Sequence, residues 1–247
     1  RPPRSTQSRS SAASDVYKRQ ILKVGLSSKA RFATYKNKYA KPQLIVDLGS
    51  VSQQKLIEQI SSSKDKALSK FYAHEIAEKQ RRVLKSKNQT KLIREKFGFD
   101  ILFSSSYRIA KSSKDFLWFR RDTEKGSVNF YISKIKNKNK LNINLIRDSI
   151  SKKFIPGPIE KTHMSTDQGY IPKSKEFQLT ESLKLTETRG IWEVKNQFMA
   201  GPFINHTVAH KNNPEELYIL EGFVYSPGTT KRDYIFELEA IFKSIKF

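Results

Sequence analysis

The sequence predicts an α+β protein in which antiparallel sheets pack against a few helices. Apolar alternation typical of strands is concentrated in the second half of the chain. Apolar residues at helical spacing occur in a few separate blocks, and strands and helices do not alternate regularly. A regular alternation would instead favour a parallel α/β sheet, so the pattern favours α+β.

The first half of the chain predicts two short strands followed by helices. The strands cover residues 21–27 and 43–49, which are apolar runs bounded by polar residues. A capping box from Ser50 to Gln53 begins a helical region that extends to Phe97. Gly98 suits a left-handed cap at the end of that region.

The second half predicts strands at 99–103, 115–121, 128–132, 183–194, 201–209 and 216–225. The run DFLWFRR at 115–121 is apolar on both alternating faces, which favours a central strand. A helix is predicted over 141–154, where Leu141, Leu145, Ile146, Ile150 and Phe154 form its apolar face. We expect Trp192, Phe198, Phe203 and Phe223 to lie in the core.

The chain ends in a predicted amphipathic helix. Thr230 and Asp233 form a second candidate capping box. The apolar stripe that we expect to pack on the sheet consists of Tyr234, Ile235, Leu238, Ile241, Phe242 and Ile245.

Residues 1–20 resemble the translation of a transposase-type sequencing adaptor. Their ending DVYKRQ corresponds to GAT GTG TAT AAG AGA CAG, and the preceding SSAAS to TCG TCG GCA GCG TCA. Such a segment is excluded from fold reasoning. We therefore expect residues 1–20 to be non-native, 21–97 to be a truncated N-terminal strand-plus-helix region, and 98–247 to be a C-terminal α+β sandwich domain.

The chain is strongly basic, with a formal net charge of +23. Residues 61–153 hold 24 Lys and Arg against 9 Asp and Glu. This imbalance fits a polyanionic partner such as nucleic acid, anionic lipid or an acidic glycan, but net charge alone favours the simpler interpretation of a lysine-rich solvated surface. No nucleic-acid-binding signature accompanies it, so we do not expect nucleic acid as the partner.

Residue types and spacing give no enzyme motif. The sequence has no cysteine, no phosphate-binding loop and no G-x-S-x-G. His206 and His210 lie four apart on a predicted strand, which separates them by about 13 Å, too far for one metal ion. On a helix the same spacing would bring the two histidines together. Catalytic residues cannot be assigned from the sequence, and we expect no metal and no cofactor.

Charged residues inside the predicted strands are the candidate ligand-binding residues. A buried charge must be paired, so these residues form either an internal Arg–Glu network or a pocket that binds a carboxylate or phosphate. The alternating pattern places Glu187, Arg189 and Glu193 on one face of their strand. The candidates are Arg120, Arg121, Arg189, Glu193 and Glu221.

Several sequence blocks resemble a Bacteroidota family known as domain of unknown function 4837. They are DFLWFRRDT, RDSISKKFIPGP, THMSTD, ETRGIWEVKNQFMAGPF and the last 27 residues from EGFVY onward. Members resemble lipoproteins, which implies a signal peptide, an acylated cysteine upstream of this chain and a place in the cell envelope. The resemblance brings no catalytic residues. The order of elements from Phe97 onward is also similar to PsbP/Mog1-like sandwiches.

Taken with that resemblance, the sequence favours a non-enzymatic, envelope-associated lipoprotein that acts as a binding or assembly module. The expected partner is an envelope protein or an anionic polymer, and contact with a membrane is expected only through the missing N-terminal lipid anchor. Two alternatives remain open. One is an enzyme or small anionic ligand binder with an Arg/Glu pocket, and the other is a polyanion binder.

Overall fold

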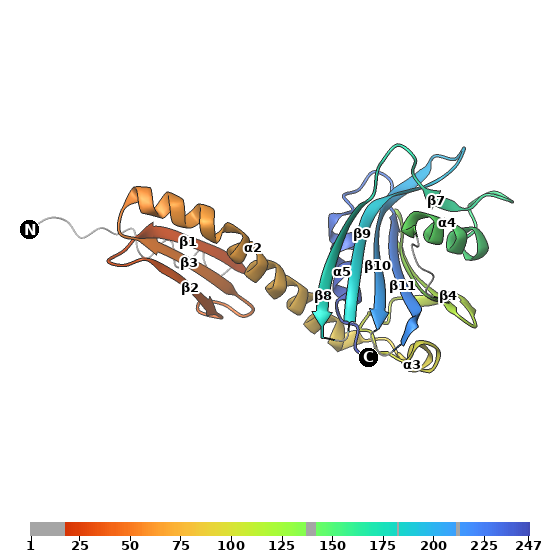
Figure 1. The fold of residues 1–247 in the computed structure, drawn as a ribbon, viewed down its shortest axis with the longest axis horizontal. Helices are drawn as coiled ribbons and strands as arrows, with labels where there is room; N and C mark the ends of the chain where they lie inside the picture. Colours follow the sequence, from red (N-terminus) through yellow and green to blue (C-terminus); the bar gives the residue numbers. More distant parts are fainter. Residues whose placement is uncertain (1–17, 137–141, 182, 211–212) are drawn as a thin grey trace, which may run out of the picture. The chain divides into compact units, whose positions relative to one another are not determined.

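The computed structural model describes residues 18–136, 142–181, 183–210 and 213–247 (Figure 1). The chain divides into an N-terminal unit, Arg1–Lys79, and a C-terminal unit, Gln80–Phe247. This boundary falls within the helix α2 (Gln53–Val83), earlier than the expected boundary at 97/98. The reason is that Ile93 and Phe97 are buried in the core of the C-terminal unit.

The N-terminal unit is a small sheet with α2 packed on one face. The sheet order is β1-β3-β2, with β1 (Gln20–Leu26) parallel and β2 (Arg31–Lys36) antiparallel to β3 (Leu44–Ser50). The residues of its core are Val46, Leu48 and Ala67, with Phe32 and Phe71 packed against them. The side chains of Leu22, Val24 and Leu26 on the edge strand β1 are exposed.

The C-terminal unit is built on a curved antiparallel sheet in the order β4-β5-β6-β11-β10-β9-β7, and β8 pairs with the same edge of β9 as β7. The strands are β4 (Arg108–Ser113), β5 (Phe116–Thr123), β6 (Gly126–Lys136), β7 (Met164–Thr166), β8 (Lys173–Thr180), β9 (Leu183–Val194), β10 (Met199–His210) and β11 (Asn213–Tyr225). The helical elements are η1 (Leu84–Ser86), α3 (Lys91–Phe97), α4 (Ile143–Phe154) and α5 (Arg232–Phe242). The α+β fold class is confirmed.

Alternating side chains give this sheet a buried core on each face. On the face covered by α5, the core includes Phe130, Leu220 and Phe242. On the face covered by α4, it includes Phe116 and Tyr131. Figure 1 shows α4 and α5 on opposite sides of the strands. We call these the α4 face and the α5 face.

Most predicted elements are present, and the apolar stripe of the last helix packs as expected. Leu238, Ile241 and Phe242 are buried, and Tyr234, Ile235 and Ile245 pack against the same core. The bounds of β9 match the prediction, and α3 ends at Gly98 in the left-handed conformation (φ 78°). The start of α4 was predicted at 141, which lies outside the described residues.

Several local predictions were wrong. Residues 99–103 form no strand, although Phe99 and Phe103 are buried, because this segment pairs with other backbone only through isolated bridges. The run at 115–121 forms β5, which lies one strand from the edge and not at the centre. Phe198 lies exposed in the turn between β9 and β10, outside the core.

Neither predicted capping box forms as expected. At the start of α2, Ser52 and not Ser50 caps the helix, and its Oγ accepts a hydrogen bond from the Lys55 amide at 3.4 Å. At the start of α5, the capping position is Lys231, which has no side-chain cap bond. The strands β2, β4, β7 and β8 were not predicted at all.

No described helix combines the length and the apolar character needed to span a bilayer.

Candidate functional site

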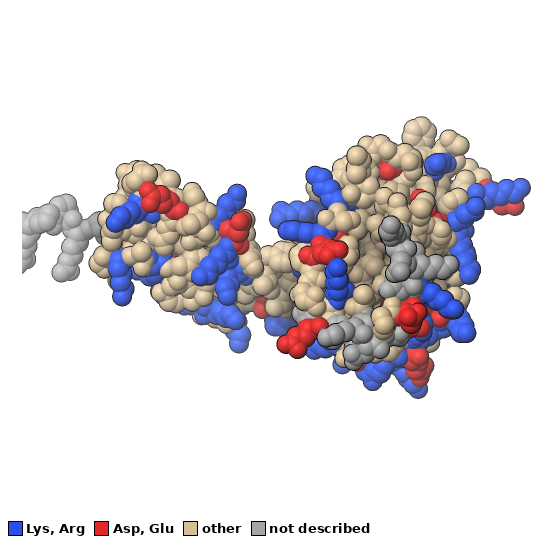
Figure 2. All heavy atoms as spheres, in the orientation of Figure 1, with Lys and Arg blue, Asp and Glu red and all other residues tan. Residues whose placement is uncertain are grey.

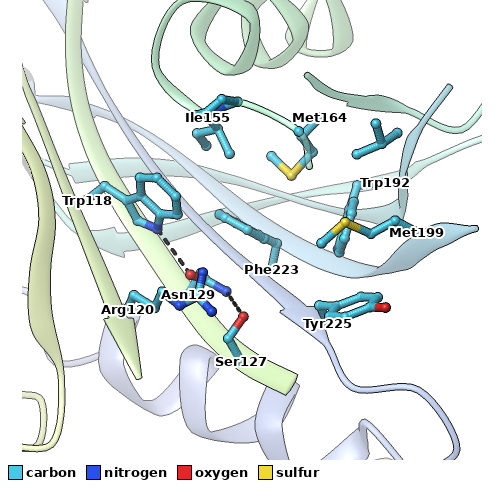
Figure 3. Close-up of a pocket in the computed structure, with 13 residues that line it drawn as sticks. Trp118, Arg120, Ser127, Asn129, Ile155, Met164, Trp192, Met199, Phe223 and Tyr225 are labelled. Carbon is cyan, nitrogen blue, oxygen red and sulfur yellow. Dashed lines mark hydrogen bonds between the residues drawn. The ribbon is translucent and has the colours of Figure 1, made fainter. Parts of the chain in front are cut away.

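A small pocket opens on the α4 face of the C-terminal unit. Its walls are apolar and are formed by Trp118, Trp192, Phe223, Met164 and Met199 (Figure 3). The segment 155–157 that follows α4 closes one side. The cavity has a volume of about 70 Å³. Apolar walls around a few polar groups are the usual composition of a small-molecule site.

One end of the pocket is polar. The indole Nε1 of Trp118 donates to Asn129 Oδ1 at 3.2 Å, and Asn129 Nδ2 donates to Ser127 Oγ at 2.9 Å (Figure 3). Arg120 lies beside them and donates from Nε to Asp122 Oδ1 at 2.7 Å. The side chain of Arg120 is 39% exposed, so its remaining guanidinium donors can reach solvent or a ligand.

Trp192 has a buried indole N–H without a hydrogen-bond partner among the described residues. The side chain is almost fully buried, and a buried donor that lacks a partner costs free energy. The neighbouring Gly201 provides room for the ring, because a Cβ at this position would lie 3.1 Å from Trp192 Nε1 and 2.0 Å from the Val224 carbonyl oxygen. The N–H is therefore a buried donor behind the wall of the pocket, packed against Gly201, and it presents almost no surface to the cavity itself.

Next to the pocket, a buried ion pair joins α4 to the sheet. Arg147 donates from Nε and Nη2 to the two carboxylate oxygens of Glu221 at 2.5 and 2.7 Å. Asn205 donates to the same carboxylate at 2.9 Å, and Arg147 Nη1 donates to Thr166 Oγ1 at 2.6 Å. The guanidinium also lies 3.3 Å from the ring centroid of Phe203. Burial would lower the pKa of Arg147, but the carboxylate of Glu221 outweighs it and the net direction is upward.

A second charged network holds α5 against the other face. Glu187 accepts from Arg189 Nε at 2.7 Å and contacts His206 Nε2 at 3.0 Å, and Arg189 Nη2 reaches Glu239 at 2.8 Å. Burial alone would raise the pKa of Glu187, but the hydrogen bonds from His206 and Arg189 outweigh it and lower it to about 2. Because Glu187 is ionised, the Nε2 of His206 must be the donor.

A third cluster lies on the same face. Arg121 Nη2 and the hydroxyl of Tyr107 both donate to Glu237 Oε1, at 3.0 and 2.8 Å. Burial raises the pKa of Tyr107 well above its usual value, and the charge of Glu237 adds to this shift.

The structure distributes the five candidate ligand-binding residues over both faces of the sheet. Arg120 lines the pocket. Glu221 lies on the same face but is bound by Arg147. Arg121 and Arg189 pair with carboxylates of α5, and Glu193 shares the face of Arg189. The five residues thus do not line one pocket, and a ligand-binding role for each of them stays a prediction.

Arg147 is the residue that sequence reasoning missed. The predicted apolar face of its helix included Leu145, which is 67% exposed. A face drawn through Ile143, Arg147 and Ile150 at helical spacing would have placed the arginine inward.

No group of three or more described His, Asp or Glu residues is arranged to hold a metal ion. His206 is engaged by Glu187, and the side chain of His210 lies outside the described residues. The distance between the two histidine side chains therefore stays a prediction.

Residues 86–244 match the model of the family described as "Domain of unknown function (DUF4837)". The chain belongs to this family. The match covers the pocket and both charged faces of the sheet. A second family model, "Domain of unknown function (DUF8532)", matches residues 8–84, so it begins inside the segment interpreted as an adaptor. No curated protein matches the chain.

Among solved structures, one similar chain is the STAR-related lipid transfer protein, fragment 25–204, from Xanthomonas axonopodis. It is 8% identical, and the similarity covers 57% of this chain and 96% of that chain, with a TM-score of 0.22. A TM-score this low does not indicate a shared fold or a shared ligand.

The ion pair of this DUF4837 domain predicts a specific pattern of stability changes. Arg147→Met leaves the Glu221 carboxylate buried without its cation, so the free energy of unfolding falls by about 3–5 kcal/mol. The double variant Arg147→Met with Glu221→Met removes both charges and is more stable than Arg147→Met alone. Urea denaturation followed by tryptophan fluorescence measures both effects, and additive losses in the double variant would contradict the assignment.

The low pKa of Glu187 predicts a loss of stability in acid. Because the folded pKa of about 2 lies below the ordinary value of 4.5, the contribution of Glu187 is complete above pH 4.5 and decreases as the pH falls toward 2. The urea midpoints of the unsubstituted chain and of the Glu187→Gln variant should therefore differ at pH 7 and converge near pH 2. Glu124→Gln, in the exposed turn between β5 and β6, serves as the control. A constant difference over this range would refute the prediction.

Proposed function

We propose that this protein is a binding module of the cell envelope whose C-terminal unit takes a compact apolar group into the pocket on the α4 face. The observation that carries this proposal is the cavity between the indole rings of Trp118 and Trp192, with the guanidinium of Arg120 at its polar end. An apolar ligand would bury its carbon surface between these rings.

The size of the pocket limits the ligand. A cavity needs roughly 10–15 Å³ to hold one water molecule, so about 70 Å³ corresponds to about five waters. That space accepts a single ring or a short branched chain. Arg120 at the polar end favours a ligand with a negative charge, because guanidinium groups bind carboxylates through paired hydrogen bonds.

The carboxylates next to the pocket support binding over catalysis. Glu221 is held by Arg147 and Asn205, and Asp148 accepts from the amide and the hydroxyl of Thr166 at 2.8 Å each. A general base must be able to reach and accept a proton from the substrate. A carboxylate fixed in an internal network is poorly suited to this role.

The envelope location and the lipid anchor are supported by the resemblance to a lipoprotein family described above. In this proposal the partner is an envelope protein or an anionic polymer, and the pocket binds one apolar group of it or a free small ligand.

Binding at the pocket should change the tryptophan fluorescence, because both tryptophans of the sequence line the cavity. Phenylacetate, a ring with a carboxylate, should give a saturable change. Trp192→Leu should weaken its binding by about tenfold, because one aromatic wall of the cavity is lost. Arg120→Met should weaken phenylacetate binding and leave benzyl alcohol binding unchanged.

The matched control is Arg108→Met. Arg108 pairs with Arg120 across the β4–β5 ladder and donates to the same Asp122, but it does not line the pocket. Equal losses in the Arg108 and Arg120 variants, or no saturable fluorescence change with any ring compound, would reject the pocket as a binding site.

The location is tested by extending the gene upstream of the codon for Ile21. We expect a signal peptide that ends in a cysteine for lipid attachment, which directs the protein to the envelope. A leaderless start directly before this codon would contradict the envelope proposal and leave the pocket proposal unaffected.

A further inference from the structure

Three large apolar side chains are exposed in three turns of the C-terminal unit. Phe198, in the turn between β9 and β10, is 109% exposed, which means that it contacts almost nothing. Ile171 is 86% exposed in the segment between β7 and β8, and Ile159 is 55% exposed in the segment before β7. Single exposed apolar residues are ordinary, but several at one end of a molecule indicate a contact surface.

The three turns lie at one end of the sheet. Val194 pairs with Met164 on one side and with Met199 on the other, so the β9–β10 turn lies next to the start of β7. The segment before β7 folds back on itself through the pair Pro156–His163. The segment after β7 leaves at Asp167, whose amide donates to the Ile191 carbonyl. We call this region the three-turn end.

A polar hollow lies between the three turns. Its volume is about 350 Å³, and each turn contributes to its lining: Lys161 and His163 from the first, Gln168 from the second, and Lys195 and Asn196 from the third. The one carboxylate in the lining, Asp148, is hydrogen-bonded to Thr166. Two lysines and several hydrogen-bonding side chains therefore face a space that suits an anionic group.

The surface of this end is mainly uncharged. Figure 2 shows the upper part of the C-terminal unit, where these turns lie in Figure 1, mostly as uncharged residues, with lysine and arginine side chains and a few acidic ones around them. Lysine side chains beside exposed apolar ones are typical of segments that enter the interface of a membrane.

We propose that the three-turn end binds the surface of a bilayer that contains anionic phospholipid. Phe198, Ile171 and Ile159 enter the boundary between headgroups and acyl chains. Lys161 and Lys195 hold a phosphate-bearing headgroup in the hollow between them. This contact is separate from the lipid anchor, and it does not depend on a ligand in the pocket.

A lipid surface fits these residues better than a protein partner does. The three apolar side chains project from separate turns with a polar hollow between them, and they form no continuous apolar face. A protein interface needs such a face, whose centre is apolar and poor in charge. A bilayer instead accepts isolated apolar tips in its interface and places phosphate groups beside the lysines.

The experiment uses phosphatidylcholine vesicles in which a quarter of the lipid is phosphatidylglycerol. The sequence has no cysteine, so Phe198→Cys can carry one nitroxide label at a defined position. When vesicles are added, we expect this label to become shielded from a water-soluble nickel complex and accessible to dissolved oxygen. A label at Ile109→Cys, on the 50% exposed position of the edge strand β4, should stay in water.

Co-sedimentation with the same vesicles tests the individual side chains. Phe198→Ser with Ile171→Ser should weaken binding by about tenfold or more, because two large apolar side chains no longer enter the bilayer. Leu84→Ser with Ile109→Ser removes two exposed apolar residues of η1 and β4, away from the three-turn end, and should have no effect. Lys161→Gln with Lys195→Gln should weaken binding more than Lys85→Gln with Lys114→Gln.

The controls separate oriented binding from the general attraction of a basic chain. If both lysine pairs cause the same loss and the apolar variants cause none, the net charge alone explains the binding and the proposal is overturned. Equal exposure of the two labels to water would overturn it as well. The phenylacetate titration is done without vesicles, so it tests the pocket proposal independently of membrane binding.

Discussion

The C-terminal unit depends on the buried ion pair between Arg147 and Glu221. Taking both charges out of water is costly, and only close geometry and further hydrogen bonds offset that cost. Here the carboxylate receives three donors, and the guanidinium also contacts Thr166 and the ring of Phe203. Because this geometry has few alternatives, it fixes where α4 lies on the sheet.

The position of α4 then determines the pocket. The helix leads directly into Ile155, Pro156 and Gly157, which form one wall, and its Arg147 and Asp148 both bind Thr166 of β7. Gly157 is close to the opposite wall, because a Cβ there would lie 3.0 Å from Val194 Cγ1. The apolar cavity and the charged network beside it therefore both depend on the position of α4. On the other face, α5 is held in the same way, through Glu237 and Glu239.

Sequence patterns predicted the elements whose side chains alternate clearly and missed those that lack this signal. The strand β9 and the stripe of α5 were predictable because their apolar residues repeat at the period of the element. The sequence of β8, KSKEFQLT, is mostly polar, and β7 has three residues, so neither carries such a period. The segment at 99–103 alternates like a strand, yet it only lines the core.

The candidate site was less predictable because it depends on pairing between distant segments. The charged residues inside strands were recognised, and an internal network was one of the two interpretations. The partner of Glu221 could not be identified from the sequence, because Arg147 lies 74 positions away. The predicted apolar face of its helix included the exposed Leu145 and left out Arg147. Trp192 was expected in the core, and it is buried there, but its unpartnered N–H appears only when its neighbours are placed.

Two edge strands of the described sheets, β4 and β1, differ in how readily they recruit another strand. The edge strand β4, RIAKSS, is polar, carries Lys111, and has a register irregularity between Ile109 and Lys111. Charge and irregular pairing on an edge discourage edge-to-edge association. The edge strand β1 has exposed Leu22, Val24 and Leu26 and regular pairing along its length. Edge-to-edge self-association at high concentration is therefore favoured more at β1 than at β4, and a charged residue at Val24 would oppose it.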